Sequence, residues 1–270
     1  MSPERAFAGN AVVLTGASSG IGRELAVQLA GQGALLTLAA RRADLLEQVA
    51  AECRRRGGQA AVQETDVTRE DACEALVERA AREYGRIDTL IVNAGRTMWS
   101  LFADLETLAP FEEIMRVNYF GSVYCTYYAL PHLLESRGRI VAVSSLTGKT
   151  GVPTRSGYAA SKHAMNGFFD TLRIELGGTG VSVTVACPDF VATETRERAF
   201  GADGEPIGES PVQEAKVMSA EECARRIVAG AAKRKRELVM SARGKLGMWL
   251  KLVAPGLIDG IARRAIARGR

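Results

Sequence analysis

Short, fully apolar runs alternate along the chain with stretches in which apolar residues recur every three or four positions. The first run, Ala11–Leu14, leads into a Gly/Ser-rich turn, after which Ile21, Leu25 and Leu29 repeat with helical spacing. This order predicts a strand, a tight turn and a helix. The same criterion predicts seven strands, at Ala11–Leu14, Leu35–Ala40, Ala60–Glu64, Leu90–Val92, Ile140–Val143, Val181–Ala186 and Leu238–Met240.

Strands that are apolar throughout are buried on both faces, as in a parallel sheet with helices on either side. The alternation of strands and helices therefore predicts a doubly wound α/β fold, a Rossmann fold in which ligands bind at the carboxyl edge of a seven-stranded parallel sheet. No repeat or Pro/Ser-rich linker divides the chain. We expect a single catalytic domain over residues 1–270.

Two segments depart from this pattern. Residues 194–218 contain three glycines and two prolines without a sustained period, and a loop of this length inside a compact domain is usually functional. We interpret it as a substrate loop. Residues 242–270 are amphipathic and basic, and we expect them to form a C-terminal helical extension.

The composition is that of an ordinary globular protein, with 47% hydrophobic and 24% charged residues. The formal net charge of +4 is unevenly distributed, because residues 241–270 carry +6 and residues 1–240 carry −2. The basic tail lacks a base-reading motif or an aromatic stacking platform, so we expect no nucleic-acid partner.

The cysteines indicate a reducing compartment. There are five, an odd number, widely spaced and without a CxxC pair, which favours neither a disulfide framework nor a zinc site. The two histidines are too few for a His-based metal site, and we expect no metal. No apolar run matches a signal peptide or reaches the roughly 18 to 20 residues of a membrane-spanning helix. We expect a cytoplasmic protein.

The turn after the first predicted strand has the features of a dinucleotide-binding turn. Its glycines let the backbone turn tightly and approach a phosphate, and the N-terminus of the following helix favours an anion. The position between a strand and a helix favours cofactor binding over a simple tight turn. The residues concerned are Gly16, Ser18, Ser19, Gly20, Ile21 and Gly22.

The end of the second strand indicates which dinucleotide binds. An acid at that position would hold the 2′-hydroxyl of NAD, but the residue there is Ala40, followed by Arg41 and Arg42. A guanidinium can fork onto a 2′-phosphate. We therefore expect NADP(H), with Ser18 as a second contact. The alternative is a solvated arginine pair that opens the next helix.

A Tyr-x-x-x-Lys spacing follows the fifth strand. Tyr158 and Lys162 lie on one helix face, where an ammonium can stabilise a phenolate and lower a pKa that is normally about 10. Ser145 ends the strand, where its hydroxyl can bond a carbonyl oxygen. Taken singly, the tyrosine could be a packing residue and the serine a cap. Together they predict a general acid/base site.

These motifs resemble the short-chain dehydrogenase/reductase family, and the match runs from about Asn10 to Ser241. The segments Ser145–Lys149, Tyr158–His163 and Val191–Thr195 are similar to the 11-beta-hydroxysteroid dehydrogenase-like subgroup. The motifs that fall in family order are the glycine turn, Asp66-Val67, Asn93-Ala94-Gly95, Asn118, Ser145, Tyr158, Lys162 and the stretch from Pro188 to Thr193.

The resemblance implies a role for each residue. Tyr158 would exchange a proton with the substrate oxygen, and Ser145 would polarise it. Lys162 would lower the Tyr158 pKa and bind the nicotinamide ribose, with Asn118 holding a water that relays protons to it. Asp66 and Val67 would contact the adenine, and Asn93, Ala94 and Gly95 the adenosine ribose side. Val191 and Thr193 would contact the carboxamide and phosphate side, and Pro188 is a further cofactor-binding position.

Two positions leave alternatives open. The family usually has Gly after the proline where this chain has Asp189, so the carboxylate either lies near the nicotinamide or points to solvent. Trp99, after the Asn93-Ala94-Gly95 turn, fits an apolar substrate wall as well as ordinary core.

The motifs together predict an NADP(H)-dependent oxidoreductase that interconverts a small lipophilic ketone or aldehyde and its alcohol, acting on a CH–OH group. The alternative is a catalytically silent NADP(H)-binding sensor or scaffold, which the full set of catalytic residues disfavours. We expect a homodimer or homotetramer. The basic apolar tail is interpreted as packing on a partner subunit or roofing the cleft, in preference to peripheral contact with a membrane.

Overall fold

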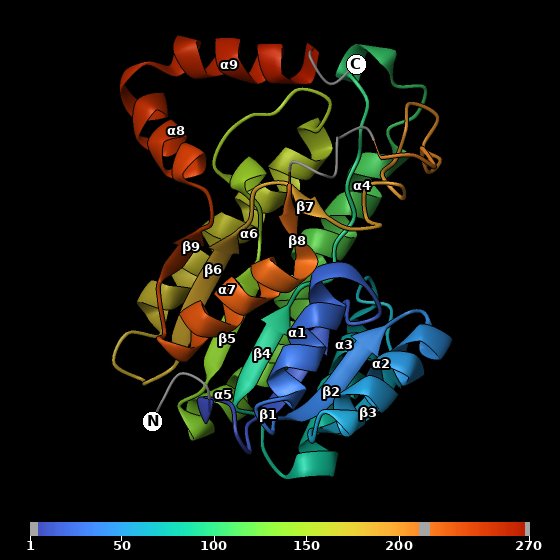
Figure 1. Cartoon of the computed structure of the whole chain (residues 1–270), viewed down its shortest axis with the longest axis vertical. Helices are drawn as coiled ribbons and strands as arrows, with labels where there is room; N and C mark the ends of the chain where they lie inside the picture. The colour runs from blue at the N-terminus through green and yellow to red at the C-terminus, as the bar shows by residue number, and fades with distance from the viewer. Residues whose placement is uncertain (1–4, 211–216, 268–270) are drawn as a thin grey trace.

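A seven-stranded parallel sheet forms the centre of the molecule (Figure 1). The computed structural model describes residues 5–210 and 217–267, and all neighbouring strands of this sheet pair in parallel, in the order β3-β2-β1-β4-β5-β6-β9. The fold prediction is confirmed. The strands are β1 (Ala11–Thr15), β2 (Leu35–Ala40), β3 (Gln59–Glu64), β4 (Thr89–Val92), β5 (Arg139–Val143), β6 (Ser182–Cys187) and β9 (Glu237–Val239).

Helices cover both faces of the sheet and create two hydrophobic cores. Alternate residues of β1 serve opposite faces: Val12 and Leu14 pack in one core and Val13 in the other. The first core includes α1 (Gly20–Ala30), α2 (Ala43–Arg55) and α7 (Ala220–Ala232), and the second includes α3 (Glu70–Tyr84), α5 (Gly121–Ser136) and α6 (Ser156–Glu175).

The helical stretch between β4 and β5 is not one regular helix. It consists of α4 (Ala109–Met115), a π-helical turn at Arg116–Phe120 and α5. The inserted turn places Asn118 in a fully buried position. Such turns occur often at functional sites. Short 3₁₀ turns lie at Phe102–Asp104 and Leu146–Gly148.

The predicted substrate loop is fastened at both ends. β7 (Val191–Ala192) pairs in parallel with β8 (Met218–Ser219), a two-stranded sheet that the aperiodic sequence did not predict. Within the loop, Phe200 bridges to Met98 and packs against it. Residues 211–216 of the predicted loop lie outside the described residues.

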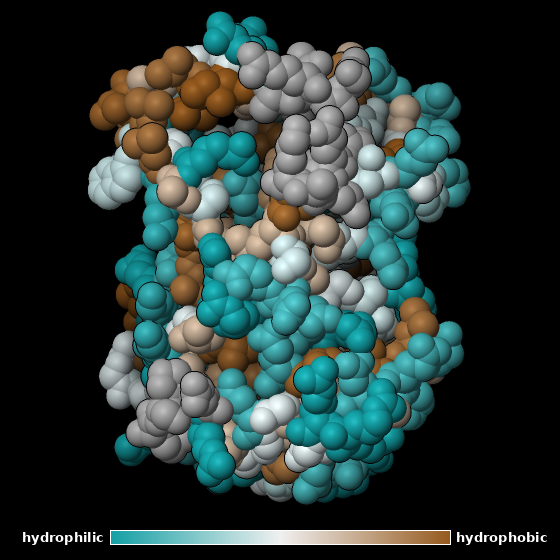
Figure 2. Space-filling view, viewed as in Figure 1, coloured by the Kyte–Doolittle hydropathy of each residue, from teal (hydrophilic) through white to brown (hydrophobic). Residues whose placement is uncertain are grey.

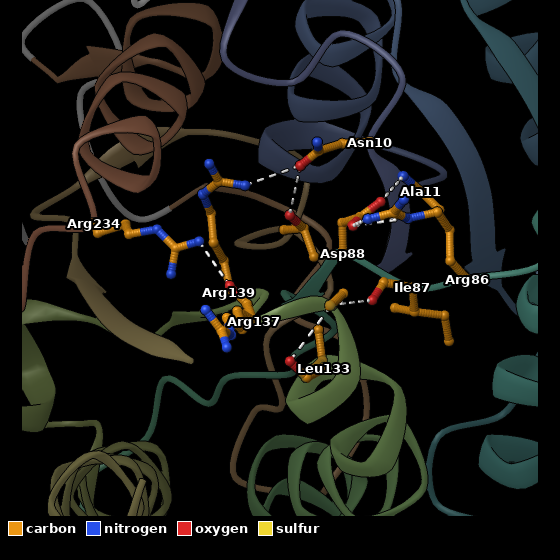
Figure 3. Close-up of polar contacts among 11 residues, drawn as sticks. Asn10, Ala11, Arg86, Ile87, Asp88, Leu133, Arg137, Arg139 and Arg234 are labelled. Carbon is orange, nitrogen blue, oxygen red and sulfur yellow. Dashed lines mark hydrogen bonds and ion pairs between the residues drawn. The ribbon is translucent and has the colours of Figure 1, made fainter. Parts of the chain in front are cut away.

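Polar side chains tie the amino edge of the sheet together (Figure 3). The buried Asp88 carboxylate accepts a hydrogen bond from the Ala11 amide at 2.9 Å, and Asn10 accepts one from Arg139 at 2.9 Å. Arg234, which lies between α7 and β9, donates to the main-chain oxygens of Arg137, Gly138 and Gly180. These contacts hold the amino ends of the strands together.

The predicted C-terminal extension is helical, with α8 (Ala242–Val253) and α9 (Pro255–Ala267) projecting beyond the sheet. Its large apolar side chains are exposed, with Trp249 at 74% and Leu252 at 75%. Figure 2 shows the resulting apolar surface over these helices, above a largely hydrophilic body. Among the described residues, no helix combines the length and apolarity needed to cross a membrane. Residues 268–270 lie outside the described part.

Candidate active site

A cavity of about 490 Å³ lies at the carboxyl edge of the sheet, where the strand order reverses between β1 and β4. The glycine turn lines one end and Tyr158 the other. Of the predicted site residues, the structure brings together Gly16, Ser18, Ser19, Ile21, Gly22, Arg41, Arg42, Asp66, Val67, Asn93, Ala94, Gly95, Ser145, Tyr158, Lys162, Pro188, Val191 and Thr193. Gly20 and Asn118 are the two predicted site residues that do not belong to this lining.

The glycine turn is packed closely against the segment after β4. Gly16 has φ +67°, and a Cβ there would fall 2.8 Å from the Ala94 Cα; a Cβ on Gly22 would fall 2.0 Å from the Gly16 oxygen. Asn93 donates from its amide to the Thr15 and Gly16 oxygens, both at 3.1 Å. Asn93 thus holds the turn, and no side chain caps the N-terminus of α1.

Gly20 begins α1, where its φ is +53° and an added Cβ would fall 3.1 Å from the Thr193 methyl group. The two arginines after β2 differ in their contacts. Arg42 donates to the hydroxyls of Ser18 at 3.1 Å and Ser19 at 2.9 Å, whereas Arg41 is exposed. Arg42 therefore fixes a cation beside the glycine turn.

Asp66 and Val67 line the cavity after β3. The Asp66 carboxylate accepts from the Thr68 amide at 3.0 Å and hydroxyl at 2.9 Å, which fixes the turn. Val67 is buried beneath α5, where a Cβ on Gly121 would fall 2.8 Å from its side chain.

Tyr158, Ser145 and Lys162 meet at the far end of the cavity. Burial raises the pKa of the Tyr158 phenol, and the Arg155 charge and a hydrogen bond with Ser145 oppose that rise. The Lys162 amine donates to the Val143 oxygen at 3.0 Å and lies 5.8 Å from the Tyr158 ring centroid. Burial lowers the pKa of Lys162 to about 8. The sequence predicted that Lys162 lowers the pKa of Tyr158. In the structure burial raises that pKa, and the charge that opposes the rise is that of Arg155.

Asn118 is held rigidly by three hydrogen bonds. Its side-chain oxygen accepts from the Arg96 amide at 2.8 Å, and its amide donates to the Arg96 oxygen at 3.0 Å and the Ser161 hydroxyl at 2.8 Å. A Cβ on Gly95 would fall 3.2 Å from the Asn118 side-chain oxygen and 3.8 Å from the Lys162 amine. The missing side chain of Gly95 thus leaves a small space between them.

Asp189 lines the cavity, and its carboxylate does not point freely into solvent. Its carboxylate accepts from the Ser241 hydroxyl at 2.9 Å and from Arg243 at 3.0 Å. Ser241 is the N-cap of α8, so the family's glycine position here connects the cavity wall to the C-terminal extension. The preceding Pro188 oxygen accepts from the Leu146 amide at 2.7 Å.

The sequence interpretation missed Arg155, Phe190 and Arg196, which all line the cavity. Arg155 is one helical turn before Tyr158, and that spacing was the available signal. Phe190 lies within the Pro188–Thr193 motif but was not among its predicted contacts, and Arg196 lies on an irregular segment without a motif. Trp99, left open between wall and core, stacks on Arg155 with 4.6 Å from guanidinium carbon to ring centroid.

Comparisons with known proteins agree with this geometry. A family model described as short chain dehydrogenase matches residues 10–203. The 11-beta-hydroxysteroid dehydrogenase 1A of Arabidopsis thaliana is 38% identical over 258 residues, covering 93% of this chain and 74% of that protein. The dehydrogenase/reductase SDR family protein 7-like of Dictyostelium discoideum is 34% identical over 268 residues, with 97% and 83% covered.

A solved structure shares the fold. The short-chain dehydrogenase/reductase from Burkholderia phymatum, in complex with NAD, aligns with a TM-score of 0.82 and 24% identity over 93% of this chain and 96% of that chain. This match shows the fold alone, whereas the family model and the curated relatives show the family. The chain belongs to the short-chain dehydrogenase/reductase family of oxidoreductases, in its 11-beta-hydroxysteroid dehydrogenase-like subgroup.

Proposed function

We propose that the protein is an NADP(H)-dependent oxidoreductase that interconverts a ketone or aldehyde and its alcohol, with Tyr158 as general acid/base. The observation that carries this proposal is a single cavity lined by Tyr158, Ser145 and Lys162 at one end and by a glycine turn at the other. A proton donor and a dinucleotide cradle in one cavity are the two parts that hydride transfer to a carbonyl requires.

The residues of the cradle fit a dinucleotide. The Gly16 and Gly22 positions have no room for a side chain, and the uncapped N-terminus of α1 adjoins the cavity, which favours a bound phosphate. Ala40, Arg41 and Arg42 line the same end without a carboxylate at the strand terminus. These residues support NADP(H), although the Burkholderia phymatum relative was solved with NAD.

The dinucleotide, when bound, exchanges a hydride with the substrate carbon. In the reducing direction, Tyr158 donates its proton to the substrate oxygen, and the Ser145 hydroxyl bonds that oxygen and holds it in place. Lys162, charged below a pKa of about 8, binds the nicotinamide ribose. Asn118 positions a water that relays protons toward Lys162, in the space that Gly95 leaves.

The test replaces the proton donor. We expect Tyr158→Phe to bind NADPH nearly as tightly as the wild type and to lose turnover by about 100-fold or more, because only the hydroxyl is removed. NADPH oxidation is followed by absorbance and cofactor binding by fluorescence. Tyr127→Phe, an exposed change on α5, is the matched control. A fully active Tyr158→Phe enzyme would overturn the mechanism.

The same measurements separate the proposal from a catalytically silent sensor. A panel of aldehydes, aliphatic ketones, quinones and steroids is offered to the wild type with NADPH. A sensor would bind NADPH but would not oxidise it with any compound of the panel. We expect turnover because the full set of catalytic residues is present. Ser145, Tyr158 and Lys162 line one cavity, and Asn118 is buried.

We also propose that the chain acts in the cytoplasm as a homodimer or homotetramer on a small lipophilic compound. All five cysteines are free and buried, which supports a reducing compartment. The exposed apolar face of α8 and α9 supports an interaction surface. We favour a partner subunit over a membrane because residues 241–270 carry +6 and residues 1–240 of a second copy carry −2, so that the two attract each other. Cell fractionation tests the location.

A further inference from the structure

Arg155 is a buried cation without an acid. It is 7% exposed, and within residues 5–210 and 217–267 no side-chain hydrogen bond or ion pair to it is formed; its buried Nε has no partner. Burial lowers the pKa of Arg155 to about 10, so the guanidinium stays charged at neutral pH. A buried charge is costly unless it is paired.

Aromatic rings hold this guanidinium in position. Its central carbon lies 4.6 Å from the Trp99 ring centroid, 5.4 Å from that of Phe190 and 5.6 Å from that of Tyr158. The three rings come from three separate segments, after β4, after β6 and in α6. Rings interact with the faces of a guanidinium, and its N–H groups point outward from the edge, where a planar oxyanion binds with two hydrogen bonds.

The surroundings favour an anion. Arg196 lies close enough for its charge to lower the pKa of Arg155, and its guanidinium carbon is 5.6 Å from the same Phe190 ring. Among the described lining residues, the carboxylates are Asp66 and Asp189. Asp66 is bound by Thr68, and Asp189 is bound by Ser241 and Arg243. Neither forms an ion pair with Arg155.

We propose that Arg155 is the substrate's anion site: the compound that reacts at Tyr158 carries a carboxylate or phosphate group near its carbonyl, and the Arg155 guanidinium binds that group. This inference rests on the proposed function and narrows its substrate class. The lipophilic body lies against the aromatic residues, and the anionic end faces Arg155, beside the phenol.

Matched carbonyl pairs test the proposal. The carboxylate pair is 4-formylbenzoate and its methyl ester, and the phosphate pair is 4-formylphenyl phosphate and 4-methoxybenzaldehyde. We expect the wild type with NADPH to prefer the anion of at least one pair by about tenfold or more in kcat/KM. The preferred pair identifies the group. A neutral compound preferred in both pairs would overturn the inference.

Two variants assign the preference to Arg155. Arg155→Met removes one partner of the buried charge pair that Arg155 forms with the substrate's anionic group. We therefore expect the variant to lower the ratio of kcat/KM for the anion to kcat/KM for the neutral compound by about 30-fold or more, mainly by raising KM for the anion. Arg155→Lys keeps the charge but lacks the fork, so its ratio should be intermediate. Arg225→Met, which removes an exposed guanidinium on α7, is the control. Equal losses on both members of a pair would show that Arg155 acts on the phenol alone and would overturn the inference.

A binding measurement separates this inference from the proposed function. If the wild type reduces none of the four compounds, the proposed reaction fails for them, and calorimetric titration with 4-formylbenzoate and 4-formylphenyl phosphate still tests the anion site. Binding by the wild type that Arg155→Met abolishes supports the site. Binding of equal strength in both proteins, or in neither, overturns it. Circular dichroism confirms folding of each variant, and Arg155→Lys replaces Arg155→Met if the latter is unfolded.

Discussion

Lys162 gives the proposed reaction a pH dependence. Burial lowers its pKa to about 8, so its charge is present below pH 8 and lost above it, while burial raises the pKa of Tyr158 and keeps the phenol protonated. We expect kcat/KM for reduction to be constant between pH 6 and 7 and to fall as the pH rises through 8.

Initial rates with NADPH from pH 6 to 9.5 measure this fall in kcat/KM. Cofactor binding measured over the same pH range shows whether the fall is caused by weaker NADPH binding. The fall follows from deprotonation of Lys162, since Tyr158 titrates at higher pH. A rate that stays level to pH 9.5 would rule out a role for the Lys162 charge.

Arg41 and Arg42 determine the expected cofactor preference. A guanidinium that forks onto a 2′-phosphate contributes about 1.5 to 3 kcal/mol, or about 10- to 150-fold in affinity. Arg41→Ala should therefore weaken NADPH binding by at least about tenfold and NADH binding far less, in fluorescence titrations. Arg55→Ala, an exposed change on α2, serves as control. Equal losses for both cofactors would contradict the assignment.

At the residue scale, the sequence was sufficient to predict site residues that are brought together by their spacing within one helix or turn. Tyr158 and Lys162 share a helix face, and Gly16 and Gly22 share a turn, so their proximity is local. Arg155 could not be predicted in the same way, because its burial depends on Trp99 and Phe190 from distant segments. The identity of the cation that opposes the rise in the Tyr158 pKa is likewise a tertiary property.

At the scale of elements, Asp189 connects the cavity wall to α8. Its carboxylate binds the Ser241 hydroxyl, which caps α8, while its pairing with the exposed Arg243 adds little. Replacing Asp189 with the family's glycine removes the acceptor of the Ser241 hydroxyl, and with it a hydrogen bond that contributes about 1 to 3 kcal/mol. We therefore expect the first turn of α8 to open more readily.

Hydrogen exchange measures this effect. Amides of α8 should lose protection in Asp189→Gly, while those of β1 and β5 keep theirs. Asp189→Asn retains an acceptor and should exchange more nearly like the wild type. Unchanged protection of α8 in the glycine variant would show that the contact does not stabilise the helix.

The strands β1, β2, β4, β5 and β6 were predicted to within one residue because burial on both faces leaves a nearly continuous apolar run, whereas β3 and β9 are only partly buried. The pairing of β7 with β8 was not predicted, because strands of two residues carry no period. The π-helical turn at Arg116–Phe120 also escaped, since its extra residue changes the hydrogen-bond register without changing the apolar composition.

At the scale of the whole molecule, the apolar face of α8 and α9 predicts self-association. Its exposed members include Trp249, Leu252 and Leu257, and exposed apolar surface of this kind marks interaction sites. We expect the full chain to sediment as an oligomer at about 10 µM and a Trp249→Ser, Leu252→Ser, Leu257→Ser variant to shift to lower mass.

Analytical ultracentrifugation measures the masses, and Lys245→Ser is a control for surface changes on the same extension. Unchanged mass in the triple variant would contradict a subunit contact through these helices. Binding of the wild type, but not the variant, to anionic lipid vesicles would favour the membrane alternative.

The amino-edge contacts of Arg234 also bear on the order in which the chain can fold. The main-chain oxygens that it binds belong to residues 54 to 97 positions earlier. The last strand of the sheet, β9, begins three residues after Arg234, at Glu237. A ribosome must therefore release the whole segment from Arg137 to β9 before this edge can close, so the edge closes only after the preceding strands have been made.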